Sequence, residues 1–233
     1  MRTFKILGLL LSYPNEEIQI NMGELKSVLR QENILPAKLE KAVVKFMDQL
    51  AARNLLKAQE DYVSLFDRGR GHSLYLFEHI HGESRDRGQA MVDLIEHYKE
   101  KGLIISSKEL PDFLPLFLEY LSLCQPAEAQ ELLGEVVHII AAIGAKLKKK
   151  DSAYSTVFLA LEKMTDAKID AEFVRQALIE DDARDDSLEA LDKEWEDTPA
   201  FDGIGDDACN TCPSATSFDF GAAPSAPDQI KVN

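Results

Sequence analysis

Apolar residues recur with helical spacing along most of the chain. From Phe4 to about Leu178 they fall at positions i, i+3, i+4 and i+7, the repeat that places one apolar stripe on an α-helix. The period-two alternation of a half-buried strand is nearly absent over this stretch. The pattern therefore predicts an all-α fold, built as a single helical bundle.

Prolines, glycines and polar residues mark where these helices should begin and end. Pro36 is expected to open a helix, because a proline at the first helical position loses no bonded N–H. The next apolar stripe is expected to end at Gly69, and a further helix should run from about Ser84 to Gly102. Glycine can adopt the positive φ that closes a helix, so both glycines are predicted C-terminal caps.

The second half of the bundle is marked in the same way. Asp112 is predicted to be the N-cap of one helix, and another helix should follow Pro126. That helix is apolar on more than one face, which predicts a central position, and its terminal lysines would complement the negative end of the helix dipole. Two shorter helices are expected around residues 154–161 and 173–178.

The composition changes beyond Ile179. An acidic stretch comes first, and glycine, alanine, serine, proline and aspartate follow after Pro199. Such a sequence buries too little apolar surface to offset the entropy lost on ordering. The sequence predicts a helical domain over residues 1–180, an acidic amphipathic segment over 181–197 and a disordered tail over 198–233.

The charge and the cysteine content exclude several classes of protein. The 26 basic and 41 acidic residues give a formal charge of −15, which would repel a nucleic acid backbone. No stretch approaches the roughly 18 apolar residues that a membrane span needs, so no membrane insertion is expected. The apolar run after Met1 lacks a small-residue cleavage site and is expected to be a core helix. With three cysteines and no disulfide framework, a reducing cytoplasm is the expected location.

Charged residues and glycines are densest over residues 67–72 and 78–88. The glycines around Arg70 could cradle a phosphate, although no lysine follows at P-loop spacing. His72, His79 and His81 could bind a metal, although their spacing matches no standard site. The favoured interpretation is a partner-binding rim pinned to the core, in which Arg85 and Arg87 pair with Asp67, Asp86 or Glu83 and the histidines orient the loop. Plain structural support is the alternative.

No residue set indicates catalysis. Serine, histidine and aspartate do not occur at the spacing of a nucleophile elbow. Cys209 and Cys212 have thioredoxin-like spacing, but they lack the strand-to-helix context that activates a thiol, and Cys124 lies in an apolar helix where a buried, inert thiol is expected. The sequence predicts no enzyme activity and no cofactor.

Several runs resemble the NarJ family of nitrate reductase assembly chaperones, over roughly residues 1 to 197. The matching runs are residues 62–70, 76–91, 109–116 and 182–186, with Ala190, Leu191, Asp192 and Trp195. The resemblance implies a helical fold of the TorD-like redox-enzyme maturation type. It implies a client, the apo catalytic α subunit of respiratory nitrate reductase, whose N-terminal region is held while molybdenum cofactor and iron-sulfur clusters are inserted. Proteins of molybdenum cofactor biosynthesis are further expected partners.

The expected binding site is an apolar groove with acidic residues beside it. Large apolar side chains left over from the core would accept an amphipathic basic helix. The residues predicted to bind the client peptide are Tyr62, Phe66, Phe77, Glu78, His79, His81, Arg85, Asp86, Asp112, Phe113, Phe117 and Tyr120, with Glu119 as a further acid. The alternative is a metal- or nucleotide-binding accessory protein that uses the loops at Gly69–His72 and His79–His81.

Overall fold

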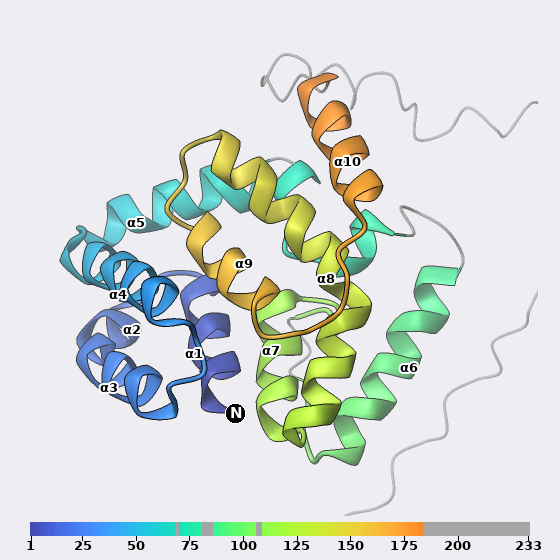
Figure 1. The fold of residues 1–233 in the computed structure, drawn as a ribbon, viewed down its shortest axis with the longest axis horizontal. Coiled ribbons are helices and arrows are strands. Elements are labelled where there is room, and N and C mark those ends of the chain that lie inside the picture. Colours follow the sequence, from blue (N-terminus) through green and yellow to red (C-terminus); the bar gives the residue numbers. More distant parts are fainter. Residues whose placement is uncertain (69, 81–85, 106–108, 184–233) are drawn as a thin grey trace, which may run out of the picture. The chain divides into compact units, whose positions relative to one another are not determined.

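The computed structural model describes residues 1–68, 70–80, 86–105 and 109–183 (Figure 1). Within these ranges the secondary structure is helical, and the one β-type pairing is an isolated antiparallel bridge between Tyr75 and Phe113. The predicted all-α fold is confirmed. The tail that was predicted to be disordered lies outside the described residues.

Ten α-helices follow one another in the described part of the chain, with three short helical turns between the fifth and the sixth. The helices are α1 (Arg2–Leu11), α2 (Glu16–Ile20), α3 (Met22–Glu32), α4 (Ala37–Ala52), α5 (Leu55–Tyr62), α6 (Asp86–Glu100), α7 (Leu114–Leu123), α8 (Pro126–Lys149), α9 (Ser155–Glu162) and α10 (Ala171–Ala183). The turns are a π-helical turn over Val63–Asp67 and 3₁₀ turns over Arg70–His72 and Leu76–His79.

Most of the predicted boundaries hold. Pro36 is the N-cap of α4, Pro126 is the first residue of α8, and Gly102 follows α6 with φ of +76°. The predicted boundaries at Gly69 and Ser84 lie outside the described residues. Helices α2 and α3 were not delimited by the apolar pattern, because they bury only Ile18 in the first and two residues in the second.

The prediction that Asp112 caps a helix is wrong. Helix α7 begins at Leu114, and Phe113 is its N-cap. The Asp112 side chain is fully buried and accepts a hydrogen bond from the backbone N–H of Phe77, at 3.1 Å. A capping aspartate would accept from a backbone N–H in the first turn of the following helix. Asp112 accepts instead from a residue that is 35 positions away in the sequence.

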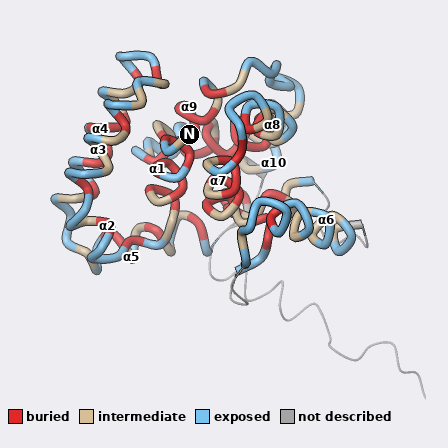
Figure 2. The backbone as a smooth tube through the Cα atoms, turned by 90° about the horizontal axis from the view of Figure 1, so that it is seen from below, coloured by how far each residue is buried: buried red, intermediate tan, exposed pale blue. Residues whose placement is uncertain are grey.

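The core runs along α1, α7, α8 and α9. Figure 2 shows buried residues concentrated on these helices, whereas α6 is mostly exposed or intermediate. Phe4, Leu7 and Leu11 of α1 are fully buried, as their spacing predicted. Helices α8 and α9 pack so closely that a β-carbon on Gly144 would lie 2.9 Å from Cβ of Phe158. Any larger residue at position 144 would therefore push these two helices apart.

Candidate functional site

A cleft of about 480 Å³ lies beside α1 and α7. Helix α1 and the residues after it contribute Lys5, Gly8, Leu9, Ser12 and Tyr13 to its lining. The other lining residues are Tyr62, Phe66, Asp67, Leu74, Tyr75, Glu109, Phe113, Pro115, Leu116 and Glu119. Five aromatic rings and three carboxylates therefore surround one cavity.

Helices α1 and α7 run antiparallel and nearly touch on one side of the cleft. A β-carbon on Gly8 would lie 3.0 Å from the carbonyl oxygen of Pro115, so a larger residue would be crowded at this approach. One turn earlier on α1, Lys5 Nζ bonds Glu119 Oε1 at 2.8 Å. The close approach of Gly8 to Pro115 sets the register of the two helices along the cleft, and the exposed Lys5–Glu119 pair spans them one turn away.

Tyr62 anchors one wall of the cleft. Its hydroxyl donates to the carbonyl oxygen of Leu11 at 2.9 Å, and its ring lies 4.9 Å from that of Phe66 and 5.6 Å from that of Tyr13. Burial is the main reason that the pKa of Tyr62 is raised, so its hydroxyl stays a hydrogen-bond donor. Tyr13 is 48% exposed, so the wall ends in an accessible ring.

A second part of the cleft lining is formed where two distant segments meet. Leu76 N–H donates to Asp112 O at 3.0 Å, and Leu114 N–H donates to Leu74 O at 2.8 Å. These bonds flank the bridge between Tyr75 and Phe113, whose rings lie 5.3 Å apart. Both rings line the cleft, so its aromatic wall depends on this backbone pairing.

Asp112 holds this pairing from within. Its Oδ2 accepts from Phe77 N–H and lies 3.7 Å from a guanidinium nitrogen of Arg87, whereas its Oδ1 has no hydrogen bond to any described residue. Burial is the main cause that raises the pKa of Asp112, and the Phe77 N–H and Arg87 act in the opposite direction. Tyr98 adds a further bond, from its hydroxyl to Pro111 O at 2.8 Å.

The charged residues of the neighbouring loop are used inside the fold. Arg87 pairs with Glu78 and Asp112, at 3.8 and 3.7 Å. Of the three acids that were predicted as partners, Asp67 makes no ion pair with a described residue, and the side chains of Glu83 and Asp86 are not described. A nitrogen of His79 lies 2.9 Å from Ser73 O. Lys146, one of the lysines predicted to complement the dipole at the end of α8, is 6% exposed and donates to Gly71 O at 3.1 Å. The loop is therefore tied to the core, as its mixed composition predicted.

The predicted client-binding residues divide into three groups. Tyr62, Phe66 and Phe113 line the cleft. Phe117 and Tyr120 are only 5% and 4% exposed and lie outside its lining, where the ring of Tyr120 packs 4.8 Å from that of Tyr98. Phe77, Glu78, His79 and Asp112 make the internal contacts of the loop. His81 and Arg85 lie outside the described residues; Asp86 begins α6, and its side chain is not described.

Four residues of the cleft lining were not predicted, because they lie on a different face of α1 from its apolar core stripe. Lys5, Gly8, Leu9 and Ser12 follow the same helical spacing as the core stripe but include polar and small residues. A face that is neither apolar nor fully charged, on a helix otherwise buried, is the signal that could have indicated a cleft.

A metal centre at the histidine loop finds no support in the described residues. Among them, no three histidine, cysteine, aspartate or glutamate side chains are grouped as a metal ion would require. His72 is 1% exposed, and Cys124 is buried. Within the same ranges, no helix is both long enough and apolar enough to span a membrane.

Comparison with known proteins decides the family. The family model described as nitrate reductase delta subunit matches residues 32–160. The nitrate reductase molybdenum cofactor assembly chaperone NarJ of Escherichia coli K12 is 42% identical over 207 residues, which cover 87% of each chain. The chain belongs to the nitrate reductase delta subunit family. The cleft wall at Tyr62, Tyr75 and Phe113 lies within the matched region.

Two further members of this group extend the likeness. The probable nitrate reductase molybdenum cofactor assembly chaperone NarW of Escherichia coli K12 is 38% identical over 197 residues, covering 84% of this chain and 82% of NarW. The probable NarJ chaperone of Bacillus subtilis is 29% identical over 159 residues, covering 68% of this chain and 85% of that protein.

Proposed function

We propose that this chain is an assembly chaperone for respiratory nitrate reductase and catalyses no reaction itself. It acts in the cytoplasm on the apo form of the catalytic α subunit. By holding the N-terminal region of that subunit, it keeps the subunit competent for insertion of molybdenum cofactor and iron-sulfur clusters before docking at the membrane. The names of relatives that match over most of their length support this role. Proteins of molybdenum cofactor biosynthesis are proposed as further partners.

The observation that carries the proposal is the cleft beside α1 and α7. Its aromatic and aliphatic lining suits the apolar face of an amphipathic helix, which is a recurring way of recognising a peptide in a groove. Leu9 and Leu116 are partly exposed within this lining, so a client side chain can reach them. Each apolar client side chain that is buried against Leu9 or Leu116 would contribute about 1.5–3 kcal/mol of binding free energy.

The charges of the cleft define the other face of the client. Three carboxylates and one lysine line it, which leaves a surplus of negative charge. Basic residues of the client would be attracted to this surplus, which raises the association rate and adds specificity. Because such attraction acts partly through solvent, binding is expected to weaken as salt is added.

Titration calorimetry tests the proposal with purified chain and a client peptide of about twenty residues, long enough for five helical turns. The peptide carries the first residues of the α subunit. Binding is expected at low salt and should weaken at high salt. Leu116→Gln, inside the cleft, should lower the affinity roughly tenfold, because it removes an apolar anchor.

Leu159→Gln is the matched control, since Leu159 is a helical leucine that is 43% exposed and does not line the cleft. It should bind like the wild-type chain. Absence of binding at low salt, or equal losses in both variants, would contradict the proposal.

A further inference from the structure

The two ends of the cleft differ in how their carboxylates are compensated. Glu119 lies where Lys5 of α1 reaches α7, and its carboxylate accepts the lysine ammonium at 2.8 Å. Asp67 and Glu109 line the cleft together with Tyr75, whose pKa is raised mainly by burial and in part by these two carboxylates. Tyr75 is bridged to Phe113, six residues before Glu119, and six residues of helix span ~9 Å along the axis.

Within the described ranges, Glu119 has a cation of the chain as its partner, and the carboxylates near Tyr75 have none. Among the described residues, neither Asp67 nor Glu109 makes an ion pair, whereas Glu119 pairs with Lys5. Burial raises the pKa of Asp67, the direction expected of a carboxyl group that loses water without gaining a cation. A basic client residue beside Asp67 or Glu109 would therefore form a new ion pair. Beside Glu119, it would only take the place of Lys5.

We propose that Lys5 is an internal counterion that reserves Glu119 and so fixes the register in which a basic client helix enters the cleft. The inference rests on the proposed function. A client cation beside Asp67 and Glu109 forms an additional ion pair. A client cation beside Glu119 must displace Lys5, so one ion pair is exchanged for another and little is gained.

The exposure of the Lys5–Glu119 pair suits this role. The side chains are 54% and 40% exposed, so the pair is solvated and weak and can be exchanged by a competing cation. It acts as a selector of register and contributes little to the stability of the fold. Removing the lysine charge should change which peptides bind best and should leave the unfolding temperature nearly unchanged.

A charge scan along the client peptide tests the inference. A set of peptides carries a single lysine at successive positions on the polar face of one helical sequence, and the affinity of each is measured by titration at low salt. The wild-type chain should show one position at which the lysine strengthens binding. In Lys5→Gln a second favourable position should appear about six residues away, with a gain of roughly two- to fivefold.

Two further variants keep the result interpretable. Lys57→Gln removes another exposed lysine, whose ion pair with Glu60 lies outside the cleft, and should show the wild-type profile. The double variant Lys5→Gln, Glu119→Gln should lose the second position, because no carboxylate remains there.

The possible failures are distinguishable. If the wild-type chain binds the peptides but Lys5→Gln shows the same profile, the role of Lys5 is overturned and the proposed function stands. If a second position persists in the double variant, Glu119 is not the acceptor and the inference is equally overturned. If the wild-type chain binds no client peptide at low salt, the proposed function itself fails.

Discussion

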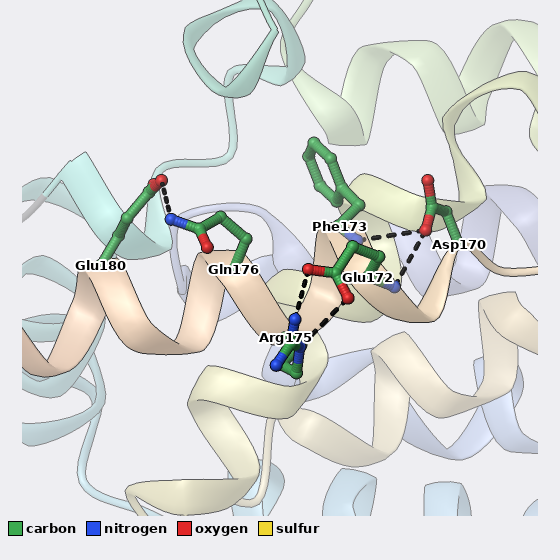
Figure 3. A network of polar contacts seen from close by, with 6 residues as sticks. All are labelled: Asp170, Glu172, Phe173, Arg175, Gln176 and Glu180. Carbon is green, nitrogen blue, oxygen red and sulfur yellow. Dashed lines mark hydrogen bonds and ion pairs between the residues drawn. The ribbon is translucent and has the colours of Figure 1, made fainter.

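Two aspartates that precede helices do different work in this protein. Asp170 lies just before α10 and accepts hydrogen bonds from the backbone N–H groups of Glu172 and Phe173, at 2.9 and 3.1 Å (Figure 3). Asp112 lies two residues before α7, yet its carboxylate accepts from Phe77, 35 residues away in the sequence. Asp170 is an exposed local cap, whereas Asp112 is a buried link between segments.

The two aspartates therefore stabilise different parts of the fold. The contacts around Asp170 continue along α10 as exposed pairs, from Arg175 to Glu172 and from Gln176 to Glu180 (Figure 3). They stabilise one helix. Asp112 joins the turn at Phe77 to the start of α7 and so holds the Tyr75–Phe113 wall of the cleft. Disturbing Asp112 should therefore affect both stability and client binding.

Asp112→Ala should have the largest effect. It removes the buried carboxylate that accepts a hydrogen bond from Phe77 N–H and that pairs with Arg87. Removing one partner of a buried hydrogen bond costs about 1–3 kcal/mol of unfolding free energy. Urea unfolding should show this loss, and titration should show weaker binding of the client peptide. If the variant is destabilised but binds the client peptide with wild-type affinity, Asp112 does not support binding at the cleft.

Asp170→Ala should have a smaller and local effect. Loss of an N-cap costs about 1 kcal/mol of helix stability, and here the helix is α10 alone. Hydrogen exchange should become faster in α10, while exchange in α7 and the affinity for the client peptide stay unchanged. A loss of affinity equal to that of Asp112→Ala would show that the two aspartates do not differ as described.

Asp112→Asn should have the smallest effect and should change with pH. The amide oxygen can still accept from Phe77 N–H, so the loss should stay below that of the alanine variant. The folded-state pKa of Asp112 is raised, so its ionisation opposes folding. The wild-type chain should thus gain stability relative to the asparagine variant as pH falls through the raised pKa toward the unfolded value of about 3.9.

Urea unfolding of both proteins between pH 7 and pH 4 measures this difference directly, because groups common to the two proteins cancel. A constant difference over that range would show that Asp112 does not titrate differently in the folded chain.

The helices were predictable because their signals are local. The apolar stripe of α4, the proline that opens α8 and the glycine after α6 each act through neighbours within a turn or two. Periodicity predicts that a residue faces inward, and Phe117 and Tyr120 do so. It does not say which inward-facing rings border a cavity, and these two lie outside the cleft lining that Tyr62, Phe66 and Phe113 share.

The cleft itself depends on contacts between distant parts of the chain. Lys5 meets Glu119 across 114 residues, and Lys146 reaches Gly71 across 75. No local motif encodes such pairings, so Asp112 was interpreted as a cap and Lys146 only as a cation at the end of a helix dipole. The family resemblance did mark the run that begins at Leu76, next to Tyr75, and the run that contains Phe113, although it could not show that the two segments are joined by a β-bridge.

Site-specific photo-crosslinking in cells that lack mature nitrate reductase tests the central claim most directly. A benzophenone side chain replaces Tyr13, the exposed ring at the cleft, or Leu159, which lies outside its lining. Mass spectrometry then identifies the crosslinked protein and the attached segment. The account predicts a crosslink from position 13 to the N-terminal region of the apo α subunit and none from position 159. Crosslinks to that region from position 159 alone, or from neither position, would contradict it.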